Sequence, residues 1–342
     1  MNLTEILNTI RANATATYQD RIPVATQENL ESIRYAMIDE NNIMVANEFM
    51  TTLLNKLVKS VVHTKLFENP LKGLKKGTKP LGDAIEEIYN NFLKGENFNS
   101  EGTDLLTRKL PDTKTVYHSM NYQLQYPITV TREGLSKAFA SYDALESYIT
   151  NLINTLYNSA ELDEFMNIKQ LIKSALTKNA MKVVTLDSDP AADGEQAGKD
   201  FIKAVKTTSE LMVFPSADWN GYLSAQTKDK KPITTFSRKN EQILIIDAAT
   251  NTSVAVDVLA STFNMSVAEF NDTRKIVIDT FPDEDVRAVL VDEAFFQIYD
   301  DLFTITSFYN GKGLYTNYYL NVWQTQAFSI LVTAVDFKIA TE

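Results

Sequence analysis

The feature that most constrains this chain is a long stretch without proline or glycine, residues 135–189. Within it, apolar residues recur at helical spacing from Leu145 to Ala175. A helix over residues 143–178 would be roughly 54 Å long at ~1.5 Å per residue, about three times the ordinary globular length. Asp143, followed by Glu146 three residues later, resembles a capping box at its start. Because no heptad pattern elsewhere offers a coiled-coil partner, we predict a structural spine.

The composition excludes several classes of function. The 342 residues include no cysteine and only two histidines, His63 and His118, so disulfides, thiolate ligands and cysteine nucleophiles are excluded. The formal net charge of −11 argues against a general nucleic-acid binder, which needs a basic face. The N-terminus has no apolar core of signal-peptide length, and no run approaches the roughly 18 apolar residues of a membrane span. We therefore expect a globular protein made in a reducing cytosol, with no membrane partner.

The first 65 residues carry short apolar stripes at helical spacing, joined by a polar segment that Pro23 interrupts. One stripe begins at Leu3, and a second runs from Phe49 to Val61. We interpret this region as an arm that lies over another surface. A loosely packed pair of helices is an alternative of equal weight.

Residues 66–135 are rich in proline and glycine and contain two extended segments, residues 85–92 and 113–131. In the second segment, alternate residues from Val116 to Tyr126 form one face with the period of two that is typical of a half-exposed strand. We predict a long two-stranded excursion. It should rest on another surface, because an isolated two-stranded ribbon is marginal in water.

The remainder of the chain alternates between shorter elements. A polar loop with glycine and proline, residues 187–199, is the best boundary candidate. Beyond it we predict a buried strand over residues 242–248, and the other expected elements are helices at 200–212 and 256–264 and strands within 274–281 and 287–300. Aromatic and β-branched residues over 313–340 predict two final strands that return to the spine helix.

No constellation of residues points to catalysis. Acidic neighbours such as Asp163 and Glu164 do not face each other along a helix, whereas a glycosidase needs two carboxylates across a cleft. The stretch GLKKGTK is not a phosphate loop, because only three residues separate Gly73 from Gly77 and Thr78 follows directly. No serine lies in a G-x-S-x-G elbow. We predict no catalytic, cofactor-binding or metal-binding residues.

The eight residues 72–79, which include this glycine-containing stretch, contain four lysines: Lys72, Lys75, Lys76 and Lys79. The overall negative field of the chain opposes docking on polyanions. We therefore predict that these lysines are inter-subunit contacts, which meet carboxylates of an adjacent copy.

Five long stretches, in a constant order, carry a resemblance to a known family: NPLKGLKKGTKPLGDAIEEIY (69–89), ESYITNLINTLYNSAELDEF (146–165), VDVLASTFNM (256–265), AVLVDEAFFQIYDDL (288–302) and GLYTNYYLNVWQT (313–325). In them the chain closely resembles the major capsid proteins of phi-twenty-nine-like small podoviruses (Picovirinae). The resemblance implies an α+β protein with the Hong Kong 97-like fold of tailed-phage capsids.

The resemblance also implies an assignment of parts: an N-terminal arm (1–65), an extended E-loop (66–135), a P domain with the spine helix (136–194), an A domain (195–305) and returning strands of the P domain (306–342). In this assignment the four lysines begin the E-loop, which laps onto the P domain of the neighbouring subunit and meets acidic surface there. The immunoglobulin-like domain that some relatives carry is not expected after Glu342. The covalent Lys–Asn cross-link of the fold's prototype is not carried over.

We therefore expect a non-enzymatic shell protein, located in the virion capsid and, during assembly, in the host cytoplasm. Its subunits would form pentamers and hexamers, with a scaffolding protein and a portal as partners. The icosahedral or prolate shell would enclose double-stranded DNA without sequence-specific contact, and an acidic inner wall would repel that DNA. Three alternatives stay open: an encapsulin-like nanocompartment shell of the same fold, a carboxylate-dependent hydrolase with acids converging in the 195–305 lobe, and a phage tail or connector component.

Overall fold

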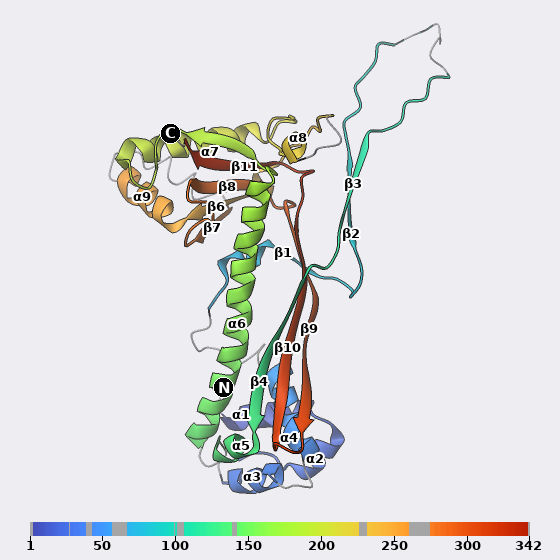
Figure 1. Ribbon diagram of the computed structural model, residues 1–342, viewed down its shortest axis with the longest axis vertical. Helices are drawn as coiled ribbons and strands as arrows, with labels where there is room; N and C mark the ends of the chain where they lie inside the picture. The colour runs from blue at the N-terminus through green and yellow to red at the C-terminus, as the bar shows by residue number, and fades with distance from the viewer. Residues whose placement is uncertain are drawn as a thin grey trace. The chain divides into compact units, whose positions relative to one another are not determined.

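The computed structural model describes residues 3–26, 28–38, 43–56, 67–98, 100, 106–138, 142–225, 231–259 and 274–340. The chain divides into two compact units, each assembled from separate stretches of sequence (Figure 1). Unit 1 comprises Met1–Asn69, Tyr122–Glu164 and Asp300–Gln324, and unit 2 comprises Pro70–Asn121, Phe165–Tyr299 and Thr325–Glu342.

Unit 1 is built on antiparallel strands. Strand β4 (Tyr122–Thr131) pairs with β10 (Tyr315–Phe328), from Thr131 opposite Tyr315 to Tyr122 opposite Gln324. On its other side β10 neighbours β9 (Phe296–Asn310), whose first residues belong to unit 2, as does β1 (Lys75–Thr78). The helices that contribute to this unit are α1 (Leu3–Asn13), α2 (Ala16–Arg21), α3 (Leu30–Ile38), α4 (Ile43–Lys56), α5 (Arg132–Ala138) and the first part of α6 (Tyr142–Thr177).

The N-terminal helices are part of the hydrophobic core of unit 1. Ile10 and Phe49 are fully buried in one cluster with Leu320 of β10. In α4, the side-chain oxygen of Asn47 accepts hydrogen bonds from Thr316 Oγ1 at 3.0 Å and from Tyr318 Oη at 3.2 Å. The described N-terminal residues are therefore packed helices, as in the second of the two interpretations, but closely rather than loosely packed. The expected stripe beyond Lys56 lies outside the described residues, and the role of an arm stays a prediction.

Unit 2 contains a five-stranded mixed sheet of order β5-β11-β8-β6-β7. Its strands are β5 (Lys182–Leu186), β6 (Gln242–Asp247), β7 (Arg274–Ile278), β8 (Val286–Asp292) and β11 (Ala334–Ile339). Strand β11 is parallel to β5 and antiparallel to β8, and β6 is antiparallel to β8 and parallel to β7. All six residues of β6 are buried, which confirms the predicted buried strand.

Alternate residues of this sheet enter two different cores, because successive side chains of a strand point to opposite faces. Ile243 and Ile245 pack with the later part of α6, including Ile172. Leu244 and Ile246 pack instead with Phe201 of α7 (Gly194–Leu211), in the core that α9 (Ala248–Leu259) also joins. The unit also contains three short helical elements: η3 (Pro70–Leu74), α8 (Tyr222–Ala225) and η4 (Lys239–Glu241).

The predicted spine helix is confirmed as α6, a single helix of 36 residues. It begins at Tyr142, so Asp143 lies inside its first turn rather than before it. Two other helix boundaries were wrong. Helix α7 begins at Gly194, inside the expected loop of residues 187–199, and α9 begins at Ala248 rather than residue 256.

The expected single strand over residues 113–131 is two strands. Strand β3 (Thr113–His118) pairs with β2 (Ile85–Asn90) in a separate two-stranded sheet, whereas β4 pairs with β10. Alternate exposure runs through both strands and through the break at residues 119–121. The period of two therefore gave no sign of the break, since each strand has one covered face.

Candidate assembly surface

The β2–β3 ribbon of unit 2 has two faces with different surroundings. Its register places Glu86 opposite Tyr117 and Asn90 opposite Thr113. One face is partly buried and consists of Ile85, Glu87, Tyr89, Lys114, Val116 and His118. The opposite face is exposed, and on it Ile88 and Tyr117 remain 60% and 66% exposed. The exposed face is thus available to a partner.

Side-chain hydrogen bonds brace the exposed face across the two strands. Tyr117 Oη donates to Glu86 Oε1 at 2.7 Å, and Thr113 Oγ1 donates to the side-chain oxygen of Asn90 at 2.7 Å. The hydrogen bond to the Glu86 carboxylate raises the pKa of Tyr117 above its ordinary value. Cross-strand pairs of this kind stabilise a ribbon by a few tenths of a kcal/mol, up to about 1 kcal/mol each.

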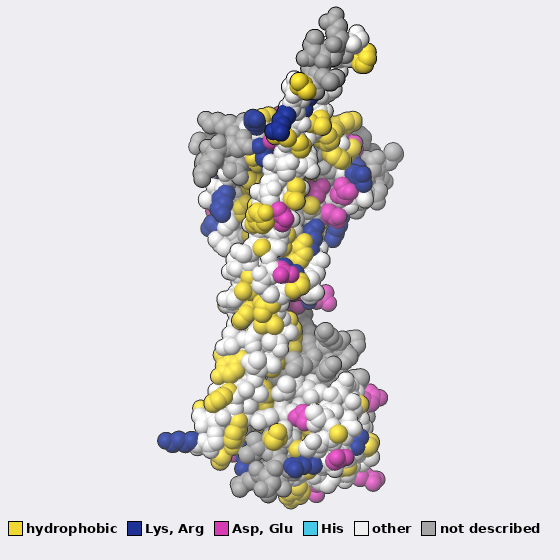
Figure 2. Space-filling model, turned by 90° about the vertical axis from the view of Figure 1, so that its right-hand side faces the viewer, with side chains coloured by type: hydrophobic (Ala, Val, Ile, Leu, Met, Phe, Trp, Pro, Cys, Tyr) yellow, Lys and Arg dark blue, Asp and Glu magenta, His cyan; other side chains and the backbone are white. Residues whose placement is uncertain are grey.

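Beyond the strands, the chain exposes large apolar side chains. Leu93 is 76% exposed, Phe98 93%, Leu106 94% and Leu110 81%. Figure 2 shows hydrophobic side chains in yellow at the upper end of the view, along the described part of the ribbon. Large apolar side chains that are exposed on one segment make that segment a candidate interaction site. We call these four residues the ribbon tip.

The covered face of the ribbon rests on its own unit. Tyr89 and Val116 pack against a buried cluster that contains Tyr222, Ile233 and Leu331. The hydroxyl of Tyr89 donates to the backbone carbonyl of Thr234. This is the surface that the predicted two-stranded excursion required.

The lysine-rich stretch is held by leucines that the sequence analysis did not single out. Leu71 and Leu74 of η3 are buried in the core beneath α6. Their spacing of three residues, the repeat of a 3₁₀ turn, was the available signal. Between them Lys72 is exposed, while the carbonyl of Gly73 accepts a hydrogen bond from Arg274 at 3.2 Å.

Lys76 and Lys79 contact their own subunit. Lys76 Nζ donates to the backbone carbonyl of Glu293 at 2.5 Å, and Lys79 Nζ donates to that of Asp83. Lys75 lies in β1 and is partly buried, so Lys72 and Lys76 are the more exposed members of the group. The role of all four as inter-subunit contacts stays a prediction.

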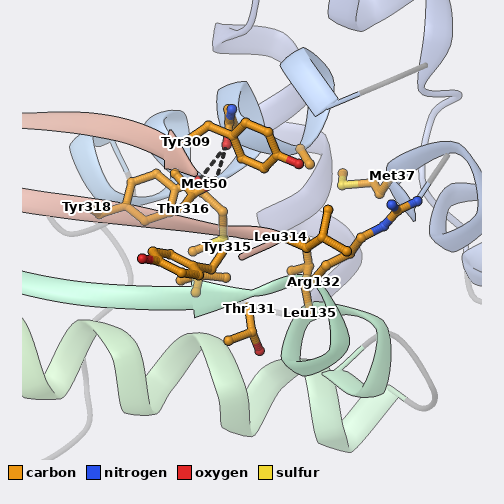
Figure 3. Close-up of a pocket in the computed structure, with 13 residues that line it drawn as sticks. Met37, Met50, Thr131, Arg132, Leu135, Tyr309, Leu314, Tyr315, Thr316 and Tyr318 are labelled. Carbon is orange, nitrogen blue, oxygen red and sulfur yellow. Dashed lines mark hydrogen bonds between the residues drawn. The ribbon is translucent and has the colours of Figure 1, made fainter. Parts of the chain in front are cut away.

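A small pocket in unit 1 lies where the ends of β4 and β10 meet the N-terminal helices (Figure 3). Met37, Met50 and Leu135 line it, and Arg132 is the one charged residue among its lining residues. The bonds from Thr316 and Tyr318 to Asn47 lie at its wall. The described residues of its lining include no acid–base pair of the kind that hydrolysis needs.

A second hollow, in unit 2, is lined by Asp247, Asp279, Asp283 and Glu284, which are residues of the type that a carboxylate-dependent hydrolase would need. Three of the four acidic residues that line it, all but Glu284, have separate partners. Asp247 accepts from the backbone and hydroxyl of Thr250 at 2.7 and 2.8 Å, and Asp279 pairs with Lys169 at 2.7 Å. Asp283 pairs with Lys338 at 3.2 Å. These carboxylates therefore brace the fold rather than converge on a substrate.

Within the described ranges, no group of three or more histidine, aspartate or glutamate side chains is arranged to hold a metal ion. None of the helices built from those residues combines the length and apolarity that a bilayer crossing requires.

The sequence matches the family described as "Phi29-like phage major capsid protein" over residues 7–338. The chain belongs to this capsid protein family. The major capsid protein of Bacillus phage PZA is 34% identical over 339 residues, which are 97% of this chain and 72% of the relative. That of Streptococcus phage Cp-1 is 27% identical over 291 residues, 81% of this chain and 75% of the relative.

Solved structures show the same fold for this capsid protein. The capsid structure of Staphylococcus phage Andhra matches with a TM-score of 0.66 and 14% identity, covering 82% of this chain and 87% of that one. A virus-like particle from Pyrococcus furiosus matches with a TM-score of 0.50 and 13% identity, covering 85% and 98%. The expected α+β fold of the Hong Kong 97-like type is confirmed.

Family membership decides between the alternatives for function. The capsid protein is a structural protein that forms the head shell of a phage virion, not an enzyme. The nanocompartment, the hydrolase and the tail component are set aside, since the family match covers nearly the whole chain, whereas the archaeal particle shares only the fold.

Proposed function

We propose that subunits of this capsid protein assemble as pentamers and hexamers into a closed icosahedral or prolate shell around double-stranded DNA, and that the β2–β3 ribbon forms part of the contact between neighbours. The observation that carries this proposal is the ribbon tip, where Phe98, Leu106 and Leu110 are each more than four-fifths exposed. Burial of a leucine or phenylalanine side chain stabilises a contact by about 1.5 to 3 kcal/mol. A neighbouring subunit would supply the apolar surface for that burial.

The proposed parts follow the fold family. Residues 1–65 are the arm, residues 136–194 and 306–342 are the P domain, and residues 195–305 are the A domain. The E-loop is proposed for residues 66–135. Since β4 pairs with β10 of unit 1, we place the end of the free part of the E-loop near Asn121.

The proposed partners beyond the subunit itself are a scaffolding protein, a portal and the packaged DNA. The DNA would be enclosed without sequence-specific contact. The net charge of −11 supports a wall that does not adhere to the packaged polyanion. Lys72, Lys75, Lys76 and Lys79 would supply local positive charge for acidic surface on a neighbour.

The test replaces the three most exposed tip residues, Phe98, Leu106 and Leu110, by serine. We expect an unchanged melting temperature of the unassembled subunit, because these side chains contribute little to its own core. Closed shells, counted by negative-stain microscopy after co-expression with a scaffolding protein, should be lost. The matched control replaces three exposed apolar residues of unit 2 that lie outside the ribbon by serine: Leu211, Phe214 and Leu223. Shells at the level of the unmodified protein from the tip variant would refute the ribbon contact.

A further inference from the structure

Two side chains fasten the covered face of the ribbon to one backbone segment, residues 232–237. Tyr89 and Asn91 are two positions apart on an extended chain, so both point to the same face. Tyr89 bonds the carbonyl of Thr234, as described above. The backbone of Asn91 continues the ribbon by donating to the carbonyl of Asp112 at 2.9 Å. The side chain of Asn91 is therefore held in a defined position next to residues 232–237.

The side-chain amide of Asn91 uses its full hydrogen-bonding capacity at this point. Its nitrogen donates to the carbonyl of Pro232 at 3.1 Å and to Asp112 Oδ2 at 3.5 Å. Its oxygen accepts from the backbone N–H groups of Thr234 and Phe92, each at 3.2 Å. An amide offers two donors and two lone pairs, and all four are occupied. The contact resembles one rung of a β-ladder in which a side chain stands in for a backbone.

The segment to which Asn91 bonds is itself held in unit 2 by several hydrogen bonds. Thr235 exchanges two backbone hydrogen bonds with Ser216, at 2.9 and 3.0 Å. Asn220 donates to the carbonyl of Ile233 at 3.2 Å, and the side chain of Ile233 is fully buried. The backbone N–H of Ser237 bonds the carbonyl at the end of α7. The ribbon is thus tied to a rigid part of the lobe rather than to a loose loop.

The ribbon is also held at its base, where the side-chain amide of Asn121 donates to the carbonyl of Gln326 at 2.8 Å and its oxygen accepts from the backbone N–H of Gln326 at 2.9 Å. On one side the chain reaches β2 through a turn at Gly82, whose φ of 92° is a conformation that other residues rarely adopt. On the other side it leaves β3 through residues 119–121, which form no strand. The contacts at residues 232–237 lie at the opposite end of the β2–β3 pairing from this base, so they constrain the direction of the ribbon more strongly than the base contacts do.

We propose that Asn91, assisted by Tyr89, is a positioning latch. It fixes the direction in which the ribbon leaves the lobe, so that the subunit presents its tip to a neighbour within a narrow range of angles. Aspartate cannot replace Asn91, because a carboxylate has no donor for Pro232 and would face the carboxylate of Asp112. The effect on shells rests on the function proposed above, whereas the effect on ribbon direction does not.

The first experiment measures direction in the unassembled full-length chain. Because the protein has no cysteine, Thr115→Cys on the ribbon and Thr207→Cys on α7 place two spin labels at unique exposed positions of unit 2. We expect one narrow distance distribution, which Asn91→Ala or Asn91→Asp broadens by about twofold or more as the ribbon samples other directions. Tyr89→Phe, which removes one hydroxyl, should broaden it less.

The matched control is Asn90→Ala, because Asn90 is the adjacent residue of the same type but points to the exposed face. It should leave the distance distribution unchanged. A distribution equally narrow in Asn91→Ala overturns the latch. So does one that broadens equally in Asn90→Ala, because the effect would then be general loosening of the ribbon.

The second experiment counts closed shells from the same variants without labels. We expect Asn91→Ala to lower the yield by about tenfold, with Asn90→Ala near the unmodified protein, since loss of a positioning contact of this size shifts a local equilibrium about that far. Wild-type yields from Asn91→Ala, despite a broadened ribbon, overturn the positioning role. If the unmodified protein formed no shells, the proposed function would fail, while the distance measurement would still decide whether the latch exists.

Discussion

At the scale of single residues, one ion pair secures the polar loop that precedes α7. Asp189 receives Arg287 Nε at 2.8 Å and Nη2 at 2.6 Å, and the two side chains are only 22% and 20% exposed. Asp189 Oδ1 also accepts from the backbone of Ala191. The hydrogen bonds from the Arg287 guanidinium hold the pKa of Asp189 below its ordinary value. The ionised form of Asp189 therefore favours the folded state.

We expect Asp189→Asn to lower the free energy of unfolding at pH 7 by on the order of 2 kcal/mol, the range for hydrogen bonds to charged groups. A lowered folded-state pKa means that this stabilisation is present above about pH 4, the ordinary range of an aspartate, and is lost as the pH falls through the folded-state value. Urea unfolding should therefore show a smaller difference between variant and parent at pH 3 than at pH 7.

The matched control for that prediction is Glu195→Gln, which removes an exposed pair with Lys199 on α7. Such a pair contributes only about 0.3 to 0.5 kcal/mol. An equal loss from Asp189→Asn at both pH values would mean that packing, rather than charge, explains the effect.

Residues of this kind were beyond prediction from the sequence. Asp189 looked like one more polar residue in a loop, because its partner is 98 positions away. Asn91 and Asn47 gave no sign of their roles for the same reason: a side-chain amide is interpretable only once its acceptors are placed. The four lysines were visible as a group, yet the own-chain acceptors of Lys76 and Lys79 were not.

At the scale of elements, periodicity predicted the long and strongly patterned segments. Helix α6 and strand β6 are at the expected places because each buries a continuous face. The second half of β9 was missed, since residues 301–310 mix buried and exposed side chains without strict alternation. The start of α7 was missed because its first turn is polar and contains Gly194 and Glu195, which suit a loop equally well.

The buried face of α6 leads to a prediction at this scale. Ile172 is fully buried between α6 and the five-stranded sheet. We expect Ile172→Ala to lower the free energy of unfolding by about 2 to 5 kcal/mol, because the cavity left behind adds to the lost transfer energy. Chemical denaturation followed by circular dichroism measures it.

The neighbouring exposed residue Lys173 provides the control, since Lys173→Ala should change stability by less than about 0.5 kcal/mol. A loss from Ile172→Ala no larger than that of the control would contradict the packing of α6 on the sheet.

At the scale of the whole molecule, the chain is acidic but carries local positive charge near the base of the ribbon. Lys72 is exposed there, held between the buried Leu71 and Leu74. We expect Lys72→Glu to slow shell assembly by about tenfold at low salt while the melting temperature of the subunit stays the same, because charges at the rim of a contact act mainly on encounter. Light scattering against ionic strength measures the rate.

Lys203→Glu is the matched control, an exposed lysine on α7 with the same change of charge. An equal slowing by both variants would show that net charge alone governs assembly. In that case the lysine group would have no specific acceptor on a neighbour.

The discontinuous make-up of unit 1 has a consequence for synthesis on the ribosome. Asn47 finds its hydrogen-bond partners 269 and 271 positions later, and Leu320 completes the core around the first helices. The apolar faces of those helices therefore stay exposed until almost all of the polypeptide, including β10, has been translated. A nascent chain that lacks β10 cannot complete unit 1. The order of translation therefore delays its incorporation into the shell until the whole chain has been made.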